Sequence, residues 1–173
     1  EITAVRDGSS ADGPGWSLRV VPNRVPALRV EAGMSGGQDG LFVHRPGLGA
    51  HEVVVETPSH DVSWFTMSAD ELARIFSAWR DRMADLRRDG RLRAVVAFKN
   101  HGAEAGARLA HAHSQIVATP LVPPAIVQEV EAARRHHTAT GTCLFCELVA
   151  QERAAGVRVV AEMAGHVALA PYA

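Results

Sequence analysis

The segment from Leu109 to Ala118 alternates in the pattern of a β-strand, and this alternation constrains the fold more than any other feature of the chain. One face carries two imidazoles and a carboxamide, from His111, His113 and Gln115. The other face carries small or aliphatic residues, namely Ala110, Ala112, Ser114 and Ile116. The pattern therefore predicts a strand with a helix packed closely behind it and a polar site in front. An ordinary solvated strand face is the alternative, but the glycine-rich turn before the strand and the proline-rich exit after it favour a site.

Composition restricts the class of partner. The 173 residues are 47% hydrophobic and 21% charged, which is typical of a soluble globular protein with one domain or one domain and the opening of another. The formal net charge is −1, with acidic and basic residues interspersed, so we expect small molecules or other subunits as partners, and neither nucleic acid nor a membrane surface. No apolar run reaches the roughly 18 residues of a membrane-spanning helix, and no signal segment opens the chain, so the expected location is the cytoplasm.

Further strands are predicted where apolar residues alternate between turn signals. The segments are 16–21, 51–57 and 92–98, with a proline-bent extended segment at 27–31. Residues 1–16 and 33–50 are rich in glycine and turn dipeptides, so loops are expected there.

A long helix is predicted to begin after Ser68, because Ser68 and Glu71 have the spacing of a capping box. Apolar residues then repeat at helical spacing, namely Leu72, Ile75, Phe76, Trp79, Met83 and Leu86. Asp89-Gly90 ends the pattern. We expect this amphipathic helix to pack on the sheet.

The C-terminal part predicts two more helices, at 126–137 and 143–154, followed by strands at 157–161 and 167–170. The chain starts at Glu1 and stops within an apolar, strand-like pattern. Because an ordinary chain ends in polar or frayed residues, we expect a piece of a longer polypeptide.

Five motifs follow one another along the chain. They are Gly15-Trp16 with Val20-Val-Pro-Asn-Arg-Val-Pro-Ala-Leu28, His51-Glu-Val-Val-Val-Glu-Thr-Pro-Ser-His60-Asp61, Phe98-Lys-Asn100-His-Gly102-Ala-Glu-Ala-Gly106, the His-Ala-His-Ser-Gln core with its Pro-Leu-Val-Pro-Pro exit, and Cys143-Leu-Phe-Cys-Glu-Leu-Val. In this order they resemble the galactose-1-phosphate uridylyltransferase family of the histidine-triad superfamily. The resemblance implies an α+β fold with a histidine-triad-like antiparallel sheet, packed helices and two similar halves. Residues 1–140 would be the first nucleotidyltransferase domain, and 141–173 the start of the second half.

The resemblance also implies a nucleophile, His113. This imidazole would attack the α-phosphorus of a nucleotide sugar, giving a nucleotidyl-histidine, and a second sugar 1-phosphate would then accept the nucleotide in a ping-pong transfer. A neutral imidazole suits this role because one nitrogen is available near neutral pH while the other is held, commonly by a backbone carbonyl. Gln115 stands where the related hydrolases carry a third histidine. Its neutral amide would donate a hydrogen bond to a phosphoryl oxygen.

Substrate contacts are implied for residues before the His strand. Asn100, Gly102 and Gly106 would form a phosphate-binding turn, although this glycine spacing alone is also typical of an ordinary turn. Arg108 replaces the family's small hydroxyl residue, and would either clamp a phosphate or point to solvent. Asn23 would contact the ribose or base, but Val25 stands where the family often has an aromatic residue.

Zinc is the cofactor that the resemblance implies, in a structural role. His60 and His111 would supply two ligands, while the resemblance places the other two in a Cys-x-x-Cys upstream of Glu1, which the sequence does not contain. Cys143 and Cys146 would belong to a second zinc site, or would be small buried side chains on a helix.

The leading hypothesis is therefore transfer of UMP between UDP-glucose and galactose 1-phosphate. An adenylyl-transferring phosphorylase or hydrolase, such as an ADP-sugar phosphorylase, is the alternative enzyme. A non-catalytic nucleotide-binding zinc module is the alternative outside catalysis. The resemblance also implies a possible homodimer.

Overall fold

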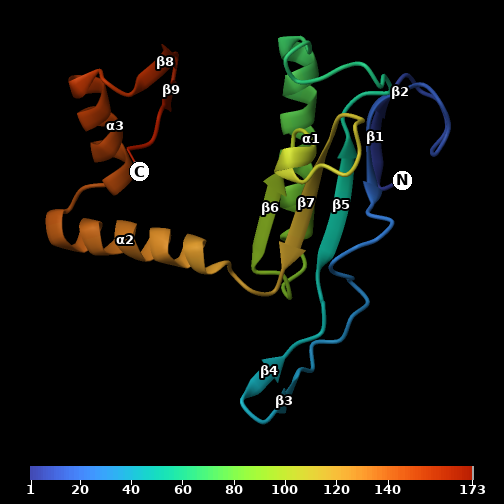
Figure 1. Ribbon diagram of the computed structural model, residues 1–173, viewed down its shortest axis with the longest axis horizontal. Coiled ribbons are helices and arrows are strands. Elements are labelled where there is room, and N and C mark those ends of the chain that lie inside the picture. The colour runs from blue at the N-terminus through green and yellow to red at the C-terminus, as the bar shows by residue number, and fades with distance from the viewer. Residues whose placement is uncertain (173) are drawn as a thin grey trace. The chain divides into compact units, whose positions relative to one another are not determined.

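The computed structural model describes residues 1–172, which form two compact units, one spanning Glu1–Val122 and the other beginning at Pro123. The first unit is built on a five-stranded sheet in the order β1-β2-β5-β7-β6 (Figure 1). Its strands are β1 (Thr3–Arg6), β2 (Trp16–Pro22), β5 (Ala50–Val55), β7 (His113–Thr119) and β6 (Ala94–Phe98). Every neighbouring pair is antiparallel. The predicted α+β fold with an antiparallel sheet is thus confirmed.

Helix α1 (Ala69–Leu86) packs on one face of this sheet, as predicted. The capping box is present, with the Ser68 hydroxyl accepting from the backbone N–H of Glu71 and the Glu71 carboxylate accepting from that of Ser68. Ile75 is fully buried against the sheet. The core also contains Leu18, Val20, Val54, Leu86, Ile116 and Ala118.

The face of the sheet away from α1 carries the polar side chains of the predicted site, those of His113 and Gln115. Alternation places Ser114, Ile116 and Ala118 in the core, so the residues between them point to the other side. Antiparallel register adds neighbours from β5, because Val55 pairs with His113 and Val53 pairs with Gln115. His51 lies one further step along the same face, opposite Val117. The predicted shared face is confirmed for His113 and Gln115, whereas His111 lies just before β7 begins.

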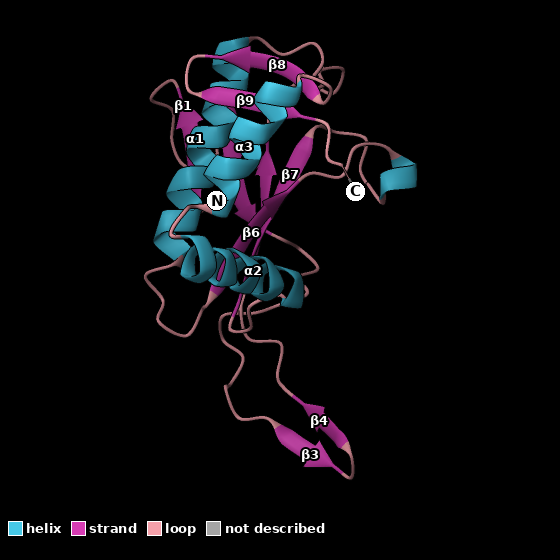
Figure 2. Ribbon diagram, turned by 90° about the vertical axis from the view of Figure 1, so that its left-hand side faces the viewer, coloured by secondary structure: helices cyan, strands magenta, loops and turns pink. Residues whose placement is uncertain are grey.

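Three local predictions differ from the structure. Residues 3–6 form β1, although a loop was expected, because this short segment completes the sheet edge by pairing with β2. The extended segment predicted at 27–31 forms only an isolated bridge between Arg29 and Leu48, since flanking prolines remove backbone donors. The glycine-rich connection at 33–50 contains a hairpin, β3 (Gly37–Asp39) and β4 (Phe42–His44), which extends beyond the five-stranded sheet (Figure 2).

The second unit contains α2 (Pro124–Thr140), α3 (Leu144–Ala155) and a hairpin of β8 (Val159–Met163) and β9 (His166–Leu169). Helix α2 groups with this unit, whereas the sequence placed it at the end of the first domain. The domain limits 1–140 and 141–173 stay a prediction. Across residues 1–172, no helix is both long and apolar enough to span a membrane.

Candidate active site

The imidazole of His113 is held in one tautomer by the main chain. His113 is the first residue of β7 and is 9% exposed. Its Nδ1 lies 2.8 Å from the backbone carbonyl oxygen of His111, which can only accept a hydrogen bond. A neutral imidazole carries one proton, so the proton resides on Nδ1 and the lone pair on Nε2. This is the arrangement that an imidazole nucleophile requires.

A cavity of about 460 Å³ lies beside His113 and is lined by residues from the turn before β7. It brings together five of the predicted site residues, namely Asn100, Gly102, Arg108, His111 and His113. Arg108 is exposed and forms no ion pair with any described residue, so its guanidinium is available to an anion. Of the two placements predicted for Arg108, lining of this cavity favours the phosphate contact.

The turn itself depends on two glycines. Gly102 has φ 80° and Gly106 has φ 86°, which are backbone conformations that favour glycine. Between them lies the short 3-10 helix Ala103–Ala105, and the side-chain amide of Asn100 donates to the Ala105 carbonyl oxygen. Asn100 and both glycines are thus parts of one closed loop beside the cavity.

A buried ion pair between Lys99 and Glu56 contacts the backbone of the candidate nucleophile, His113. Lys99 Nζ is 2.6 Å from Glu56 Oε2 and 2.9 Å from the backbone oxygen of His113. Trp64 Nε1 donates to the same carboxylate oxygen at 2.8 Å. The Glu56 side chain is 0% exposed, and that of Lys99 12%. Lys99 also lines the cavity, and its ammonium, paired with Glu56, anchors the backbone of His113.

The back of β7 is fixed to α1 by polar contacts. Trp79 Nε1 of α1 donates to the hydroxyl of Ser114, the residue between His113 and Gln115, at 2.9 Å. Arg82 of α1 also forms two hydrogen bonds, at 2.8 and 2.7 Å, with the buried carboxylate of Glu52 on the neighbouring strand β5. These contacts hold the strand that carries the site against the helix.

Gln115 and Asn23 both contact the imidazole of His51. His51 Nε2 lies 2.7 Å from Gln115 Oε1 and 3.0 Å from Asn23 Nδ2. Asn23 also accepts a hydrogen bond from the backbone N–H of Val25 through Oδ1. Asn23 and His51 line a second cavity, of about 320 Å³, between β5 and the Pro22–Leu28 segment. The structure thus links two predicted site residues through a histidine to which the sequence assigned no role.

His60 and His111 face one another. Their Nδ1 atoms are 3.1 Å apart, and their ring planes are inclined by 86°. His111 Nε2 lies 2.6 Å from the carbonyl oxygen of Thr57, which fixes the proton on Nε2 and leaves Nδ1 with its lone pair. Two imidazole nitrogens thus converge, as metal ligands would. Among the described residues no group of three or more His, Cys, Asp or Glu side chains is placed to hold a metal.

Cys143 and Cys146 lie at the beginning of α3 in the second unit, and both are exposed, so the alternative of buried apolar side chains is wrong. The backbone N–H and then the thiol of Cys146, followed by the backbone N–H of Phe145, donate toward Cys143 and lower the pKa of its thiol. The Cys143 sulfur in turn raises the pKa of Cys146. His136 Nε2 lies 2.8 Å from Glu147 Oε2 and is within hydrogen-bonding distance of it.

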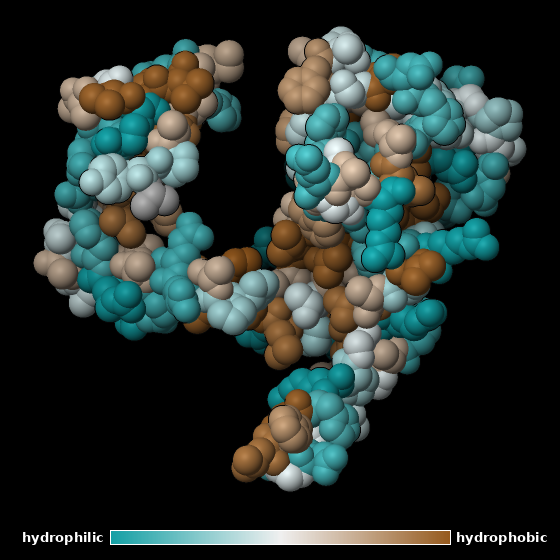
Figure 3. Space-filling view, viewed as in Figure 1, coloured by the Kyte–Doolittle hydropathy of each residue, from teal (hydrophilic) through white to brown (hydrophobic). Residues whose placement is uncertain are grey.

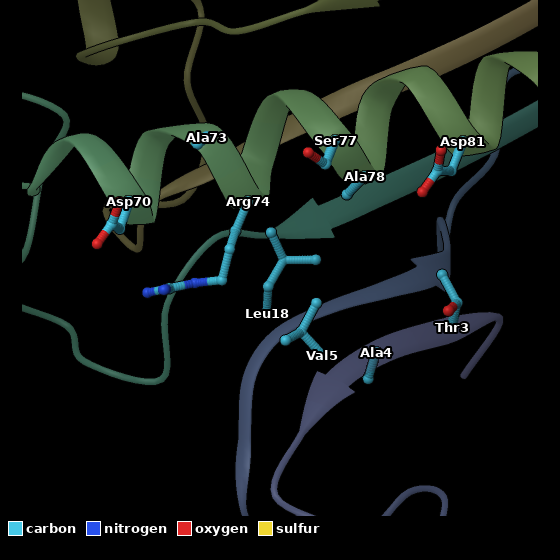
Figure 4. A pocket seen from close by; sticks show the side chains of 10 residues that line it. All are labelled: Thr3, Ala4, Val5, Leu18, Asp70, Ala73, Arg74, Ser77, Ala78 and Asp81. Carbon is cyan, nitrogen blue, oxygen red and sulfur yellow. The ribbon is translucent and has the colours of Figure 1, made fainter.

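Another cavity of about 460 Å³ lies on the α1 side of the sheet (Figure 4). Its lining comes from β1, β2 and α1 and includes Val5, Leu18, Asp70, Arg74 and Asp81. Figure 4 shows the charged side chains spread along α1 rather than converging on one point. None of the predicted site residues lines this cavity, so its size alone does not make it a site.

The fold and the site define the class of protein first. This is an α+β protein in which an inner strand of an antiparallel sheet, β7, carries a tautomer-fixed histidine and a glutamine, and a glycine-containing turn precedes that strand. The family model "Galactose-1-phosphate uridyl transferase, N-terminal domain" matches residues 20–123, which contain all of these elements. The chain belongs to the galactose-1-phosphate uridylyltransferase family, as the resemblance predicted.

Curated relatives carry two different names. ADP-glucose phosphorylase of Arabidopsis thaliana is 31% identical over 162 residues, which are 92% of this chain and 45% of that protein. Galactose-1-phosphate uridylyltransferase of Streptomyces lividans is 31% identical over 155 residues, which are 90% of this chain and 39% of that protein. The chain therefore spans less than half the length of these relatives.

The similar solved structures likewise include a uridylyltransferase and an ADP-glucose phosphorylase. A uridylyltransferase mutant superimposes with a TM-score of 0.84 at 30% identity, covering 97% of this chain and 55% of that one. ADP-glucose phosphorylase of Arabidopsis thaliana with bound ADP-glucose superimposes with a TM-score of 0.78 at 27% identity, covering 97% and 50%. The match to half of each larger chain is consistent with an N-terminal half.

Sequence reasoning missed three residues that the structure places at the site: His51, Glu56 and Lys99. For His51 a signal existed, because strand alternation puts it on the same face as Val53 and Val55. For Glu56 and Lys99, two charged residues adjoining predicted strands, the sequence gives no indication that they pair across 43 positions.

Proposed function

We propose that this chain carries the nucleophile of a nucleotidyltransferase that forms a covalent nucleotidyl-His113 intermediate. The observation that supports this most is the hydrogen bond from His113 Nδ1 to the His111 carbonyl oxygen, at 2.8 Å. It leaves the Nε2 lone pair of a neutral imidazole available without a separate base. The neighbouring cavity supplies cationic and amide groups suited to phosphates.

The transfer proceeds in two displacements. His113 Nε2 attacks the α-phosphorus of a nucleoside diphosphate sugar, forming an N–P bond as the P–O bond to the bridging oxygen breaks. The sugar 1-phosphate leaves with that electron pair. A phosphate oxygen of an acceptor then attacks the same phosphorus, and the N–P bond breaks with its electrons returning to Nε2. No oxidant or reductant is required.

Several residues would stabilise the negative charge that develops on the phosphoryl oxygens. Gln115 offers the two N–H groups of its amide, since its oxygen is engaged by His51 at 2.7 Å. Arg108 contributes positive charge from the cavity wall. Fixed donors of this kind are worth the most where water is excluded.

For the substrates, we propose UDP-glucose as donor and galactose 1-phosphate as acceptor, which the family model and the uridylyltransferase relatives support. A second candidate is the adenylyl donor ADP-glucose, with inorganic phosphate as acceptor. The similarity to ADP-glucose phosphorylase, over 92% of this chain, favours it. Val25, which is 80% exposed, leaves the Asn23 loop without an aromatic contact for a base at that position.

We propose structural zinc as the metal, held in part by His60 and His111. Their facing Nδ1 atoms, 3.1 Å apart, fit two of the four ligands of a tetrahedral site. When bound, the metal would supply no reacting group and would fix these two side chains. Because the carbonyl of His111 orients His113, a fixed His111 also steadies the nucleophile. Cys143 and Cys146 remain a proposal for a second site, with further ligands needed.

Intact-mass analysis tests the proposed function. The chain is incubated separately with UDP-glucose and with ADP-glucose, without an acceptor, so that the intermediate accumulates. A mass gain equal to UMP or AMP identifies both the covalent step and the preferred donor. The His113→Ala variant should give no gain with either donor. A folded chain that gains no mass from either donor contradicts the proposal.

A further inference from the structure

We infer that His51 is a positioning residue, which sets the orientation of the Gln115 carboxamide and ties it to the Pro22–Leu28 segment. The inference rests on the proposed function for its consequence in catalysis. Its structural basis is the set of contacts made by the His51 imidazole. His51 lies on β5, the strand next to β7, which carries the candidate nucleophile.

The main chain fixes the tautomer of His51. The backbone N–H of Ala27 points at His51 Nδ1 over 3.1 Å, and a backbone N–H can only donate. Nδ1 is therefore the acceptor, and the single proton of the neutral ring is on Nε2. The backbone N–H of Asn23 also donates to the His51 carbonyl oxygen at 2.8 Å, so the segment and the strand are joined at two points.

The proton on His51 Nε2 then decides which way the Gln115 amide faces. Gln115 Oε1 lies 2.7 Å from this nitrogen and accepts its hydrogen. Asn23 Nδ2 lies 3.0 Å away, but both nitrogens carry hydrogens in this tautomer, so the oxygen of Gln115 is the better partner. With its oxygen engaged, Gln115 turns its N–H groups outward, and the structure gives them no acceptor among the described residues.

The consequence is a preorganised donor. If the carboxamide were free to rotate, half of its orientations would present the carbonyl oxygen, and that oxygen repels a phosphoryl oxygen. His51 removes this alternative, and does so from the wall of the cavity that Asn23 lines. A ligand that orders the Pro22–Leu28 segment would thereby also secure Gln115. His51 does not touch the reacting atoms in this arrangement and acts only through Gln115.

The first experiment measures the tautomer directly, without any substrate. Long-range 1H–15N correlation spectra of the 15N-histidine-labelled chain distinguish Nδ1-protonated from Nε2-protonated rings. We expect His51 to be protonated on Nε2, and its Nε2 resonance to shift in the Gln115→Ala variant. An Nδ1-protonated His51, or a resonance unchanged by Gln115→Ala, would overturn the inference even if the chain forms no adduct.

The second experiment is a double-mutant cycle on the rate of adduct formation with the preferred donor. His51→Phe should lower the maximal single-turnover rate by roughly 100-fold, the effect of losing one oriented donor. In the Gln115→Ala background, His51→Phe should cause no further loss of that rate. His51→Gln, whose amide can donate to Gln115, should restore part of it. His166→Phe, an exposed histidine in β9, is the matched control and should react as the parent does.

The outcomes separate two failures. A parent chain that forms no adduct refutes the proposed function, and the tautomer spectra then decide the role of His51. A parent chain that forms the adduct while His51→Phe reacts at the parental maximal rate refutes the role of His51 alone. Independent, multiplying effects of His51→Phe and Gln115→Ala refute it as well. A purely structural role would raise the donor concentration at half-saturation and leave the maximal rate unchanged.

Discussion

The carbonyl oxygen of His111 accepts a hydrogen bond from Nδ1 of His113, at 2.8 Å, although the two side chains contact different partners. His111 faces His60, and His113 lines the cavity that Gly102 and Arg108 also line. One dipeptide step therefore joins a candidate metal anchor to a candidate nucleophile. The two histidine side chains of the motif have different partners, and the main chain links them.

Gln115→Ala should slow adduct formation by about 100-fold to 1000-fold, because one preorganised donor to the phosphoryl oxygen is lost. The chain should still become fully labelled at long times, since His113 is intact. The measurement is a time course of adduct mass. Val117→Ala, on the same face of β7, is the control and should react at the parental rate. Equal rates for Gln115→Ala and the parent would exclude the amide from the reaction.

Gly106→Ala should destabilise the turn between Gly102 and Gly106. At φ 86° an added methyl group costs about 1–2 kcal/mol of backbone strain, although Asn100 Nδ2, at 3.7 Å, is its only close neighbour. Urea denaturation should show this loss. Gly90→Ala is the control, because Gly90 has no positive φ and an added methyl group would have open space. Equal stability of the two variants would contradict the role of the turn conformation.

Lys99→Met should destabilise the first unit by about 3–5 kcal/mol, because it leaves the fully buried Glu56 carboxylate without its counter-charge. The double variant Lys99→Met with Glu56→Gln removes both charges, and should lose less stability than Lys99→Met alone. Urea denaturation of the parent, the two single variants Lys99→Met and Glu56→Gln, and the double variant gives the coupling energy. A Lys99→Met chain within about 0.5 kcal/mol of the parent, as for an ordinary surface substitution, would contradict this account.

Cys143 should become reactive at lower pH than Cys146. The thiolate is the nucleophile, and hydrogen bonds from Cys146 and Phe145 lower the pKa of Cys143 while Cys143 raises that of Cys146. As the pH is raised, the thiol with the lowered pKa, Cys143, loses its proton before Cys146 does. Iodoacetamide labelling over a pH series, read by peptide mass spectrometry, checks the order. Faster labelling of Cys146 at neutral pH would contradict it.

Features that depend on local sequence could be predicted. The alternation around His113 and the Ser68–Glu71 capping box both act within a few residues, and both are present. Contacts that depend on strand register could not be predicted. His51 meets Gln115 across 64 positions, only because β5 and β7 pair in one particular register.

Short edge elements were also beyond the sequence pattern. Strand β1 has four residues, too few for a clear alternation, and forms because β2 offers a free edge. The β3–β4 hairpin has three residues in each strand, and Leu41 and Phe42 are 95% and 78% exposed. Because neither strand buries one face, the sequence does not alternate between apolar and polar residues there. Figure 3 shows hydrophobic side chains gathered at the far end of the β3–β4 hairpin.

The most direct test of the account is the position of the phosphorus on the labelled chain. The 15N-histidine-labelled protein is treated with the donor that adds mass, and 31P–15N coupling locates the bond. The account predicts coupling of the new phosphorus signal to Nε2 of His113, whose Nδ1 is held by the His111 carbonyl. Coupling to Nδ1 of His113, or to any nitrogen of His111, would contradict it.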